Sequence, residues 1–206
     1  MIVRRGRGHS DAQGADYSLH TEIGDLRAWI DHLEQPVHLV GWSHGEGRPH
    51  SKMPPRTRVG SVVTYDPVLP PFAKGAVSML EEADLNERVV VINRDISGLE
   101  PEIVEAMKDQ SEWSHLRKLA IPLAAELAAL NNFTPSKKWE SVAAALIVGE
   151  RSHAVEPYGP VFDRVSERIP QASVTVLPGQ GHLAHVEDPT LLGTAIGTIL
   201  TKGVST

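Results

Sequence analysis

The sequence predicts an α/β protein built on a mostly parallel β-sheet. Three observations support this class. Short β-rich runs recur along the chain, amphipathic helical stretches separate them, and 206 residues suffice for one domain with a substantial core. Strands that are joined through helices run parallel, because the helix returns the chain to the edge where the strand began. We therefore expect a single domain over residues 1–206.

The first alternation of helix and strand precedes residue 66. Apolar side chains at spacings of three and four predict a helix over about residues 18–33, and Pro36 ends it. Residues 37–40, Val-His-Leu-Val, predict a short buried strand, and a second β-rich run covers 59–65.

The middle of the chain, residues 71–140, has a different pattern. Helical patches occur around residues 76–85, 101–107 and 121–130. This stretch would bury little core on its own, so we predict a helical insertion covering the sheet rather than a separate domain.

The last third returns to the α/β alternation. Residues 143–148 and 173–177 predict strands, and residues 161–169 and 191–200 predict amphipathic helices.

Composition limits the functional classes. Twenty Lys and Arg against 26 Asp and Glu give a net charge of −6, so no basic field exists for nucleic acid or an anionic membrane. The absence of cysteine excludes disulfides, thiolate zinc sites and cysteine catalysis. No run approaches the roughly 20 apolar residues of a membrane span, and the first residues lack a signal-peptide pattern. We expect a cytoplasmic protein without cofactor or metal.

The strongest chemical signal is a G-x-S-x-G motif, Gly-Trp-Ser-His-Gly at 41–45, directly after the predicted strand 37–40. In such a motif a sharp strand-to-helix turn strains the serine backbone and exposes its hydroxyl. The pattern predicts Ser43 as a nucleophile and the backbone N–H of His44 as an oxyanion donor. The alternative is an ordinary Gly/Ser turn.

A serine hydroxyl needs a base to accept its proton. His182, in Gly-Gln-Gly-His after the predicted strand 173–177, is our candidate base. It follows the carboxyl end of a strand, where α/β sheets place their ligand crevice. We expect His185 to be structural or exposed.

Several segments together resemble the α/β-hydrolase superfamily, in the family's order. They are the R-G-x-G-x-S-like run at 4–10, the segment 26–33, the serine motif, Tyr-Asp-Pro at 65–67, the Gly-Gln-Gly-His loop, and Glu-Asp-Pro at 187–189. The resemblance implies a parallel sheet of that type with a helical cap insertion. It also implies a serine hydrolase acting on small esters, lactones or amides, with the triad in the order serine, acid, histidine.

The identity of the triad acid is open between several positions. The family commonly places it about three residues after the glycine that ends the next-to-last strand, where this chain has Ser152, and serine cannot stabilise an imidazolium. Some branches take the acid from the strand after the serine motif, which here offers Asp66. We predict Asp66, with turn capping before Pro67 as the alternative role. Glu150 and Glu156 are the reserve candidates.

The chain departs from the family pattern in three ways. About three leading strands are missing, including the loop that donates the second oxyanion N–H, and Val3 stands where an acid is usual. We therefore expect an N-terminally truncated form. Residues 46–58 carry three prolines and a glycine where an apolar helix is usual, and we hypothesise a local frame disruption there.

The leading functional prediction is hydrolysis of a small ester-like substrate through an acyl-serine, with Trp42 and Trp113 as pocket-lining candidates. The alternative is a non-catalytic remnant that binds a partner or folds poorly. An exposed sheet edge would favour a homo-oligomer in either case. A metal hydrolase using His182 and His185 has less support, because no H-E-x-x-H pattern accompanies them.

Overall fold

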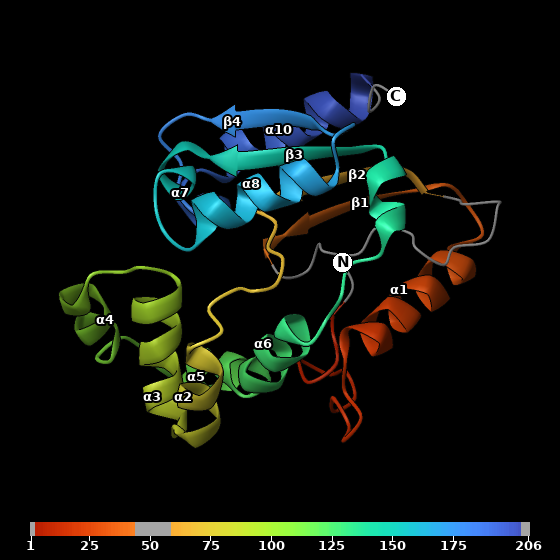
Figure 1. Ribbon diagram of the computed structural model, residues 1–206. Coiled ribbons are helices and arrows are strands. Elements are labelled where there is room, and N and C mark those ends of the chain that lie inside the picture. Colours follow the sequence, from red (N-terminus) through yellow and green to blue (C-terminus); the bar gives the residue numbers. More distant parts are fainter. Residues whose placement is uncertain (1–2, 44–58, 203–206) are drawn as a thin grey trace. The chain divides into compact units, whose positions relative to one another are not determined.

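A computed structural model describes residues 3–43 and 59–202 of the chain (Figure 1). The chain divides into two compact units. The helical unit comprises the described residues of Met1–Glu22 and Pro71–Phe133, and the sheet unit those of Ile23–Pro70 and Thr134–Thr206. The organisation of residues 1–206 as one domain stays a prediction.

The sheet unit contains a four-stranded, fully parallel sheet in the order β1-β2-β3-β4. Its strands are β1 (Val37–Trp42), β2 (Val59–Tyr65), β3 (Ala144–Gly149) and β4 (Ser173–Leu177). The predicted α/β class and parallel sheet are confirmed. β1 continues two residues beyond the predicted 37–40, because Gly41 and Trp42 pair with Thr64 and Tyr65 of β2.

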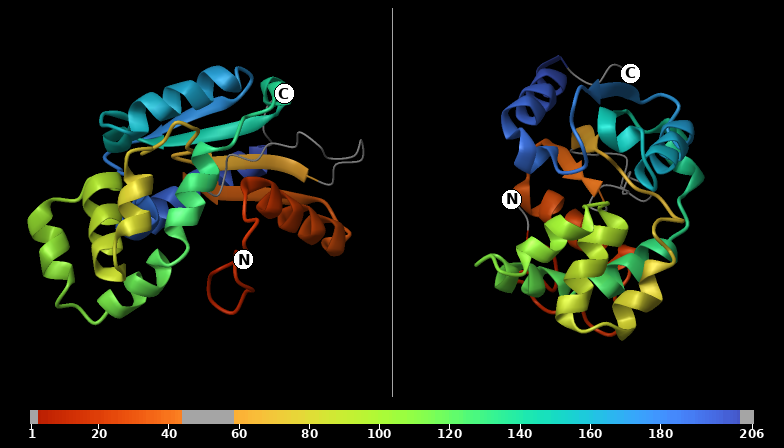
Figure 2. Two further views of the ribbon diagram at one scale, coloured as in Figure 1. Left: turned by 60° about the horizontal axis from the view of Figure 1, so that its bottom comes forward. Right: turned by 90° about the vertical axis from the view of Figure 1, so that its left-hand side faces the viewer.

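Helices cover the two faces of this sheet. Figure 2 (right) shows α8 (Tyr158–Arg168) and α10 (Pro189–Lys202) on opposite sides of the strands. Alternate side chains of a strand point to opposite faces. Val63 and Ile147 accordingly share a core cluster with Leu192 of α10, whereas Val62 and Leu146 line a pocket with Val165 of α8.

The connections of the sheet unit hold shorter helices that the sequence did not signal. These are the 3₁₀ helix η3 (Lys137–Ser141), α7 (Glu150–His153) and α9 (Ala184–Glu187). Helices of one turn gain too little from propensity to be visible in sequence and depend on tertiary contacts. The longer helix α1 (Leu19–Leu33) was predicted nearly residue for residue, and the boundary between the units falls within it.

The helical unit contains α2 (Ala76–Glu82), α3 (Leu85–Val90), the π-helix η2 (Val91–Ile96), α4 (Pro101–Met107), α5 (Trp113–Ala120) and α6 (Leu123–Asn131). The three predicted patches correspond to α2, α4 and α6. Helix α3 was missed although its start carries a capping box. The Asp84 side chain accepts hydrogen bonds from the backbone N–H of Asn86 and Glu87, at 2.7 and 3.0 Å, and the Glu87 carboxylate accepts one from the Asp84 backbone N–H at 3.1 Å.

The arginine-rich run near the start is engaged inside the helical unit. Arg4 pairs with Glu22 at 2.7 Å and with Glu126 at 3.2 Å, and Arg7 pairs with Glu126 at 2.7 Å. Tyr17 donates a further hydrogen bond to Glu22. Both carboxylates are only 2% exposed, so they need these partners. The run therefore links the N-terminal loop to α6.

Candidate active site

Ser43 follows the last residue of β1 and has a left-handed backbone, with φ of +56°. A residue with a β-carbon rarely adopts this conformation, and the strain typically marks a functional site. The strand and the turn conformation that the motif predicted are both present at this position. The predicted oxyanion donor His44 and the hypothesised frame disruption at 46–58 lie outside the described residues.

Asp66 directly follows β2 and is 2% exposed. Its backbone φ of +44° is again left-handed, and its N–H donates to the carbonyl of Ile147 at 2.8 Å. The side-chain oxygen Oδ1 accepts a hydrogen bond from the backbone N–H of Gly149 at 2.9 Å. A buried carboxylate requires such donors, and these contacts fix the orientation of Asp66 at the carboxyl end of β2.

His182 and Asp66 are brought together by the fold. The second carboxylate oxygen of Asp66, Oδ2, lies 3.0 Å from His182 Nδ1, and the histidine side chain is 9% exposed. This contact gives the Nδ1 atom a carboxylate acceptor, which is the orienting arrangement that a catalytic histidine requires. Asp66 is thus more than a residue capping a turn before Pro67.

Trp42 connects the end of β1 to the loop that carries His182. Its indole Nε1–H donates to the carbonyl oxygen of His182 at 2.8 Å. Trp42 is also the residue before Ser43. This hydrogen bond therefore links the turn that carries the predicted nucleophile to the loop that carries the predicted base.

The loop before His182 is anchored at each of its three preceding residues. Gly179 N–H donates to the Glu150 carboxylate at 2.7 Å, and the Gln180 carbonyl accepts from the Arg151 N–H at 2.9 Å. The Gly181 carbonyl accepts from the Tyr65 hydroxyl. Burial, and next the negative charge of Asp66, raise the pKa of Tyr65, so its hydroxyl stays protonated and able to donate.

The imidazole of His182 lies among aromatic rings. Tyr158 of α8 stacks on it with ring centroids 4.1 Å apart and an interplanar angle of 24°. The Trp42 ring lies 5.0 Å from His182 and 4.1 Å from His185. Tyr158 was not predicted, since no local pattern signals a stacking partner. His185 is exposed, as expected, and its pKa is lowered by partial burial and by the neighbouring His182.

The other acid candidates have different surroundings. Glu150 accepts from Gly179 N–H, as described above, and so holds the loop rather than the imidazole. Glu156 is exposed, and Ser152, at the family's common acid position, is buried in α7. Asp66 is the candidate whose carboxylate meets His182 Nδ1.

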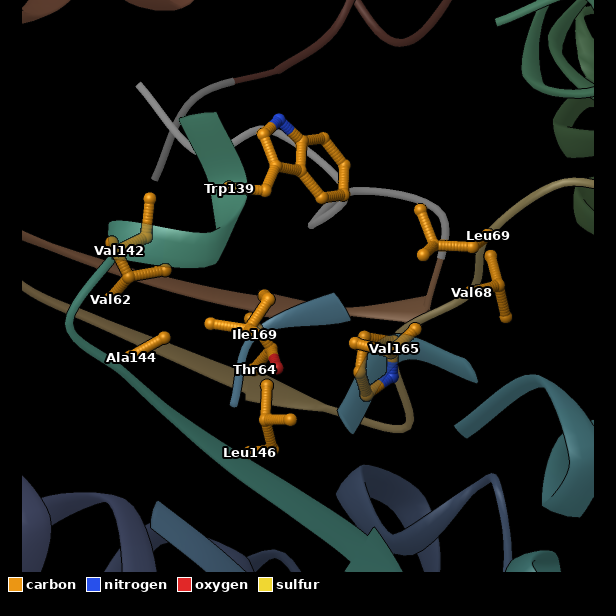
Figure 3. A pocket seen from close by; sticks show the side chains of 11 residues that line it. Val62, Thr64, Val68, Leu69, Trp139, Val142, Ala144, Leu146, Val165 and Ile169 are labelled. Atoms are coloured by element: carbon orange, nitrogen blue, oxygen red, sulfur yellow. The ribbon is translucent and has the colours of Figure 1, made fainter. Parts of the chain in front are cut away.

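A small pocket lies on the α8 face of the sheet unit (Figure 3). Its lining is mostly apolar, and the buried hydroxyl oxygen of Thr64 has no hydrogen-bond partner among residues 3–43 and 59–202. The lining residues are Val62, Thr64, Pro67, Val68, Leu69, Trp139, Val142, Ala144, Leu146, Val165 and Ile169. The predicted pocket residues Trp42 and Trp113 do not line it. Trp42 lies at His182, and Trp113 donates to Asn86 in the helical unit at 3.0 Å.

Among residues 3–43 and 59–202 there is no group of three or more His, Asp or Glu side chains placed to hold a metal ion. Within the same residues, no helix has both the length and the apolar character to cross a bilayer.

Residues 2–193 match the family described as "Alpha/beta hydrolase family", so the chain belongs to the α/β-hydrolases. A curated relative from Bacillus subtilis (strain 168), named "Putative 2-succinyl-6-hydroxy-2,4-cyclohexadiene-1-carboxylate synthase", is 24% identical over 218 residues. That alignment covers 96% of this chain and 78% of the relative.

Solved structures share the fold at lower identity. An α/β-hydrolase from Sphaerobacter thermophilus DSM 20745 matches with a TM-score of 0.70 and 22% identity, over 94% of this chain and 78% of that chain. The enol-lactonase from Burkholderia xenovorans LB400 matches with a TM-score of 0.70 and 17% identity, over 96% and 78% of the two chains. These likenesses establish the fold.

Proposed function

We propose that this α/β-hydrolase cleaves a small ester-like substrate, such as an ester or lactone, through an acyl-serine intermediate on Ser43. The observation that carries the proposal is the 3.0 Å contact between Asp66 Oδ2 and His182 Nδ1. The left-handed Ser43 at the end of β1 supports it. The fold is shared with an enol-lactonase, which supports the choice of substrate class.

In the proposed mechanism, the hydroxyl oxygen of Ser43 attacks the substrate carbonyl carbon while its proton passes to Nε2 of His182. The carbonyl electrons move onto oxygen, and the backbone N–H of His44 is the proposed donor to that oxyanion. The tetrahedral intermediate collapses, the carbon–oxygen bond to the alcohol breaks, and the leaving oxygen takes the proton from Nε2. Water then repeats the sequence on the acyl-serine, which releases the acid and restores Ser43.

Asp66 supports this cycle electrostatically. Its carboxylate keeps the Nδ1 proton in place and stabilises the imidazolium that forms when Nε2 accepts the serine proton. Because Asp66 is buried and also accepts the Gly149 N–H, its orientation is fixed before substrate binds. Such preorganisation avoids reorganisation during the reaction.

We propose that the substrate is a small molecule. The rings of Trp42 and Tyr158 lie beside the His182 imidazole, and Trp42 is 39% exposed. We propose that an apolar or planar group of the substrate packs against the Trp42 ring. The net charge of −6 gives no field that would concentrate anionic polymers.

The test is the intact mass of the protein after exposure to a phosphonate ester that labels activated serines, with Ser43→Ala as the matched control. We expect one adduct on the wild-type chain and none on the variant. Short-chain p-nitrophenyl esters and lactones then report turnover. A folded wild-type protein that takes no adduct would reject the acyl-serine mechanism and leave a non-catalytic binding role as the better explanation.

A further inference from the structure

The loop that carries His182 covers residues 178–183 and joins β4 to α9. Helix α7, which begins directly after β3 (Figure 1), binds this loop through two contacts described above. These contacts use the carboxylate of Glu150 and the backbone N–H of Arg151. Neither involves the guanidinium of Arg151, so this side chain makes its contacts separately.

The guanidinium of Arg151 reaches across the loop. Its Nη2 atom donates a hydrogen bond to the carboxylate of Glu187, the last residue of α9. A Cβ atom added to Gly181 would lie 3.4 Å from the same nitrogen, so the guanidinium lies against the residue that precedes His182. One side chain thus contacts the chain both before and after the predicted base.

Helix α9 connects Glu187 closely to His182. The helix begins two residues after His182 and has only four residues. Within it, the N–H of Glu187 donates to the carbonyl of Leu183 at 3.0 Å. A helix of one turn depends on tertiary contacts, and the Arg151 guanidinium supplies one at its carboxyl end. A displacement of α9 would therefore also displace His182.

The hydroxyl of Tyr65 provides a second indication that both charges face this loop. Burial and the negative charge of Asp66 raise the pKa of Tyr65 most. The charge of Glu187 raises this pKa further, whereas the charge of Arg151 lowers it. Both charges therefore lie close to the hydroxyl, which donates to the Gly181 carbonyl.

We propose that Arg151 is a positioning residue for His182 and acts through its ion pair with Glu187. The pair holds the loop and α9 so that the imidazole keeps its contact with Asp66 while Nε2 stays available for the serine proton. This role rests on the proposed function, because the position of His182 affects a rate only if His182 is the base. A misplacement of about 1 Å can slow a reaction by about 10²-fold.

The exposure of the pair sets the size of its effect. The side chains of Arg151 and Glu187 are 58% and 42% exposed. An ion pair in contact with solvent is weak, and its loss changes a population or a rate by about two- to fivefold. Salt screens such a pair, because the Debye length falls from about 30 Å at 0.01 M to about 3 Å at 1 M. The rate should therefore depend on ionic strength.

The first experiment measures the loop without using activity. In Arg151→Gln, backbone hydrogen exchange of a peptide covering residues 178–188 should be about two- to fivefold faster than in the wild type. Peptides from α10 should exchange as in the wild type. Arg94→Gln is the matched control, since it breaks the Arg94–Asp95 pair of the helical unit, whose side chains are 44% and 31% exposed. This control should leave the exchange of residues 178–188 unchanged.

The second experiment measures turnover of p-nitrophenyl esters. Arg151→Gln and Glu187→Gln should each lower kcat by about two- to fivefold with little change in KM. The double variant should be no slower than either single variant, because each single change already breaks the pair. In 1 M NaCl the ratio of wild-type to variant kcat should approach one. A purely packing role of Arg151 would not respond to salt in this way.

The outcomes separate this proposal from the proposed function. Unchanged exchange of residues 178–188 in Arg151→Gln overturns the role of the ion pair. Faster exchange with unchanged kcat shows that the pair holds the loop without positioning the base, and additive losses in the double variant assign Arg151 and Glu187 independent roles. Either result also overturns the proposal. Wild-type protein that takes no adduct on Ser43 rejects the proposed function, and exchange then still decides whether the pair holds the loop.

Discussion

The carboxylate of Asp66 and the Nδ1 atom of His182 lie 3.0 Å apart, although the two residues are 116 positions apart in the chain. Asp66 follows β2, and His182 follows β4, with β3 between these strands in the sheet. The contact lies at the carboxyl end of β3, where Gly149 donates its backbone N–H to Asp66 Oδ1 at 2.9 Å. We therefore propose that the triad acid Asp66 and the base His182 contact each other beside Gly149.

Replacing Asp66 by Asn should lower the rate of Ser43 labelling and ester turnover by about 10³–10⁴-fold, because the amide cannot stabilise the imidazolium and favours the wrong tautomer. Glu156→Gln, at an exposed position, is the control and should retain wild-type rates. The two variants are compared by labelling kinetics and intact mass. Full activity in the Asp66 variant, with loss of activity in the Glu156 variant, would assign the role of triad acid to Glu156.

Tyr158 should act as a positioning residue for His182. Tyr158→Leu removes the stacked ring, and we expect kcat to fall by about tenfold with little change in KM, since an aromatic contact of this kind contributes about 0.5–1.5 kcal/mol. Tyr158→Phe keeps the ring and should restore kcat. Equal losses in both variants would assign the effect to the hydroxyl group instead of the stacking.

Gly149 should tolerate no side chain. An added Cβ would lie 2.5 Å from the Tyr65 hydroxyl and 2.6 Å from the Gln180 carbonyl oxygen. We expect Gly149→Ala to reduce the free energy of unfolding by about 1–3 kcal/mol and to displace the His182 loop. Urea denaturation measures the first effect and Ser43 labelling the second.

Gly193 of α10 is the matched control for that substitution, because a Cβ there meets no atom within 4 Å. Gly193→Ala should stabilise the protein by about 0.5–1 kcal/mol, as alanine does within helices. If both alanine variants lower stability to the same degree, the close approach at Gly149 is not the cause.

Alkaline pH should destabilise the protein partly through Tyr65. Burial and Asp66 raise its folded-state pKa above the ordinary value of 10.0, so the unfolded chain loses this proton first. The contribution is fully present below pH 10 and is lost as the pH rises above that value. Tyr65→Phe should be less stable at neutral pH by about 1 kcal/mol, through the lost bond to Gly181, but should lose less stability between about pH 9 and 11.

Tyr17 allows an independent check, in the helical unit, of the predicted loss of stability at alkaline pH, since burial also raises the pKa of Tyr17. Tyr17→Phe should likewise flatten the alkaline loss of stability, and the double variant should flatten it further. Unfolding free energies that fall equally steeply in the wild-type and both single variants would contradict the predicted coupling.

Most strands and the longest helix could be predicted because their formation depends on residues that are close together in the chain. β-rich runs bounded by glycine or proline located all four strands, and helix 18–33 followed from its apolar spacing. The short helices α7 and α9 and the 3₁₀ helix η3 could not, since one turn of helix forms only where its surroundings hold it. The start of α3 does carry a local signal, the capping box formed by Asp84 and Glu87, which apolar spacing alone does not reveal.

In the candidate site, too, some residues could be predicted from local motifs and others could not. Its two local motifs, around Ser43 and His182, could be recognised because each places one residue at the end of one strand. The stacking of Tyr158 on His182 could not be, because α8 and the His182 loop are brought together only by the packing of α8 against the sheet.

The sequence by itself determined the parallel α/β class and the residues that follow each strand, since strand and turn preferences act over a few residues. Only the tertiary structure decided which carboxylate meets the histidine. Asp66 and Glu150 follow neighbouring strands, and a choice between them depends on a few ångströms. The left-handed backbone of Asp66 and the Gly149 N–H hold its carboxylate at Nδ1, while the Gly179 N–H binds Glu150. Those contacts depend on strand order, which local preferences do not encode.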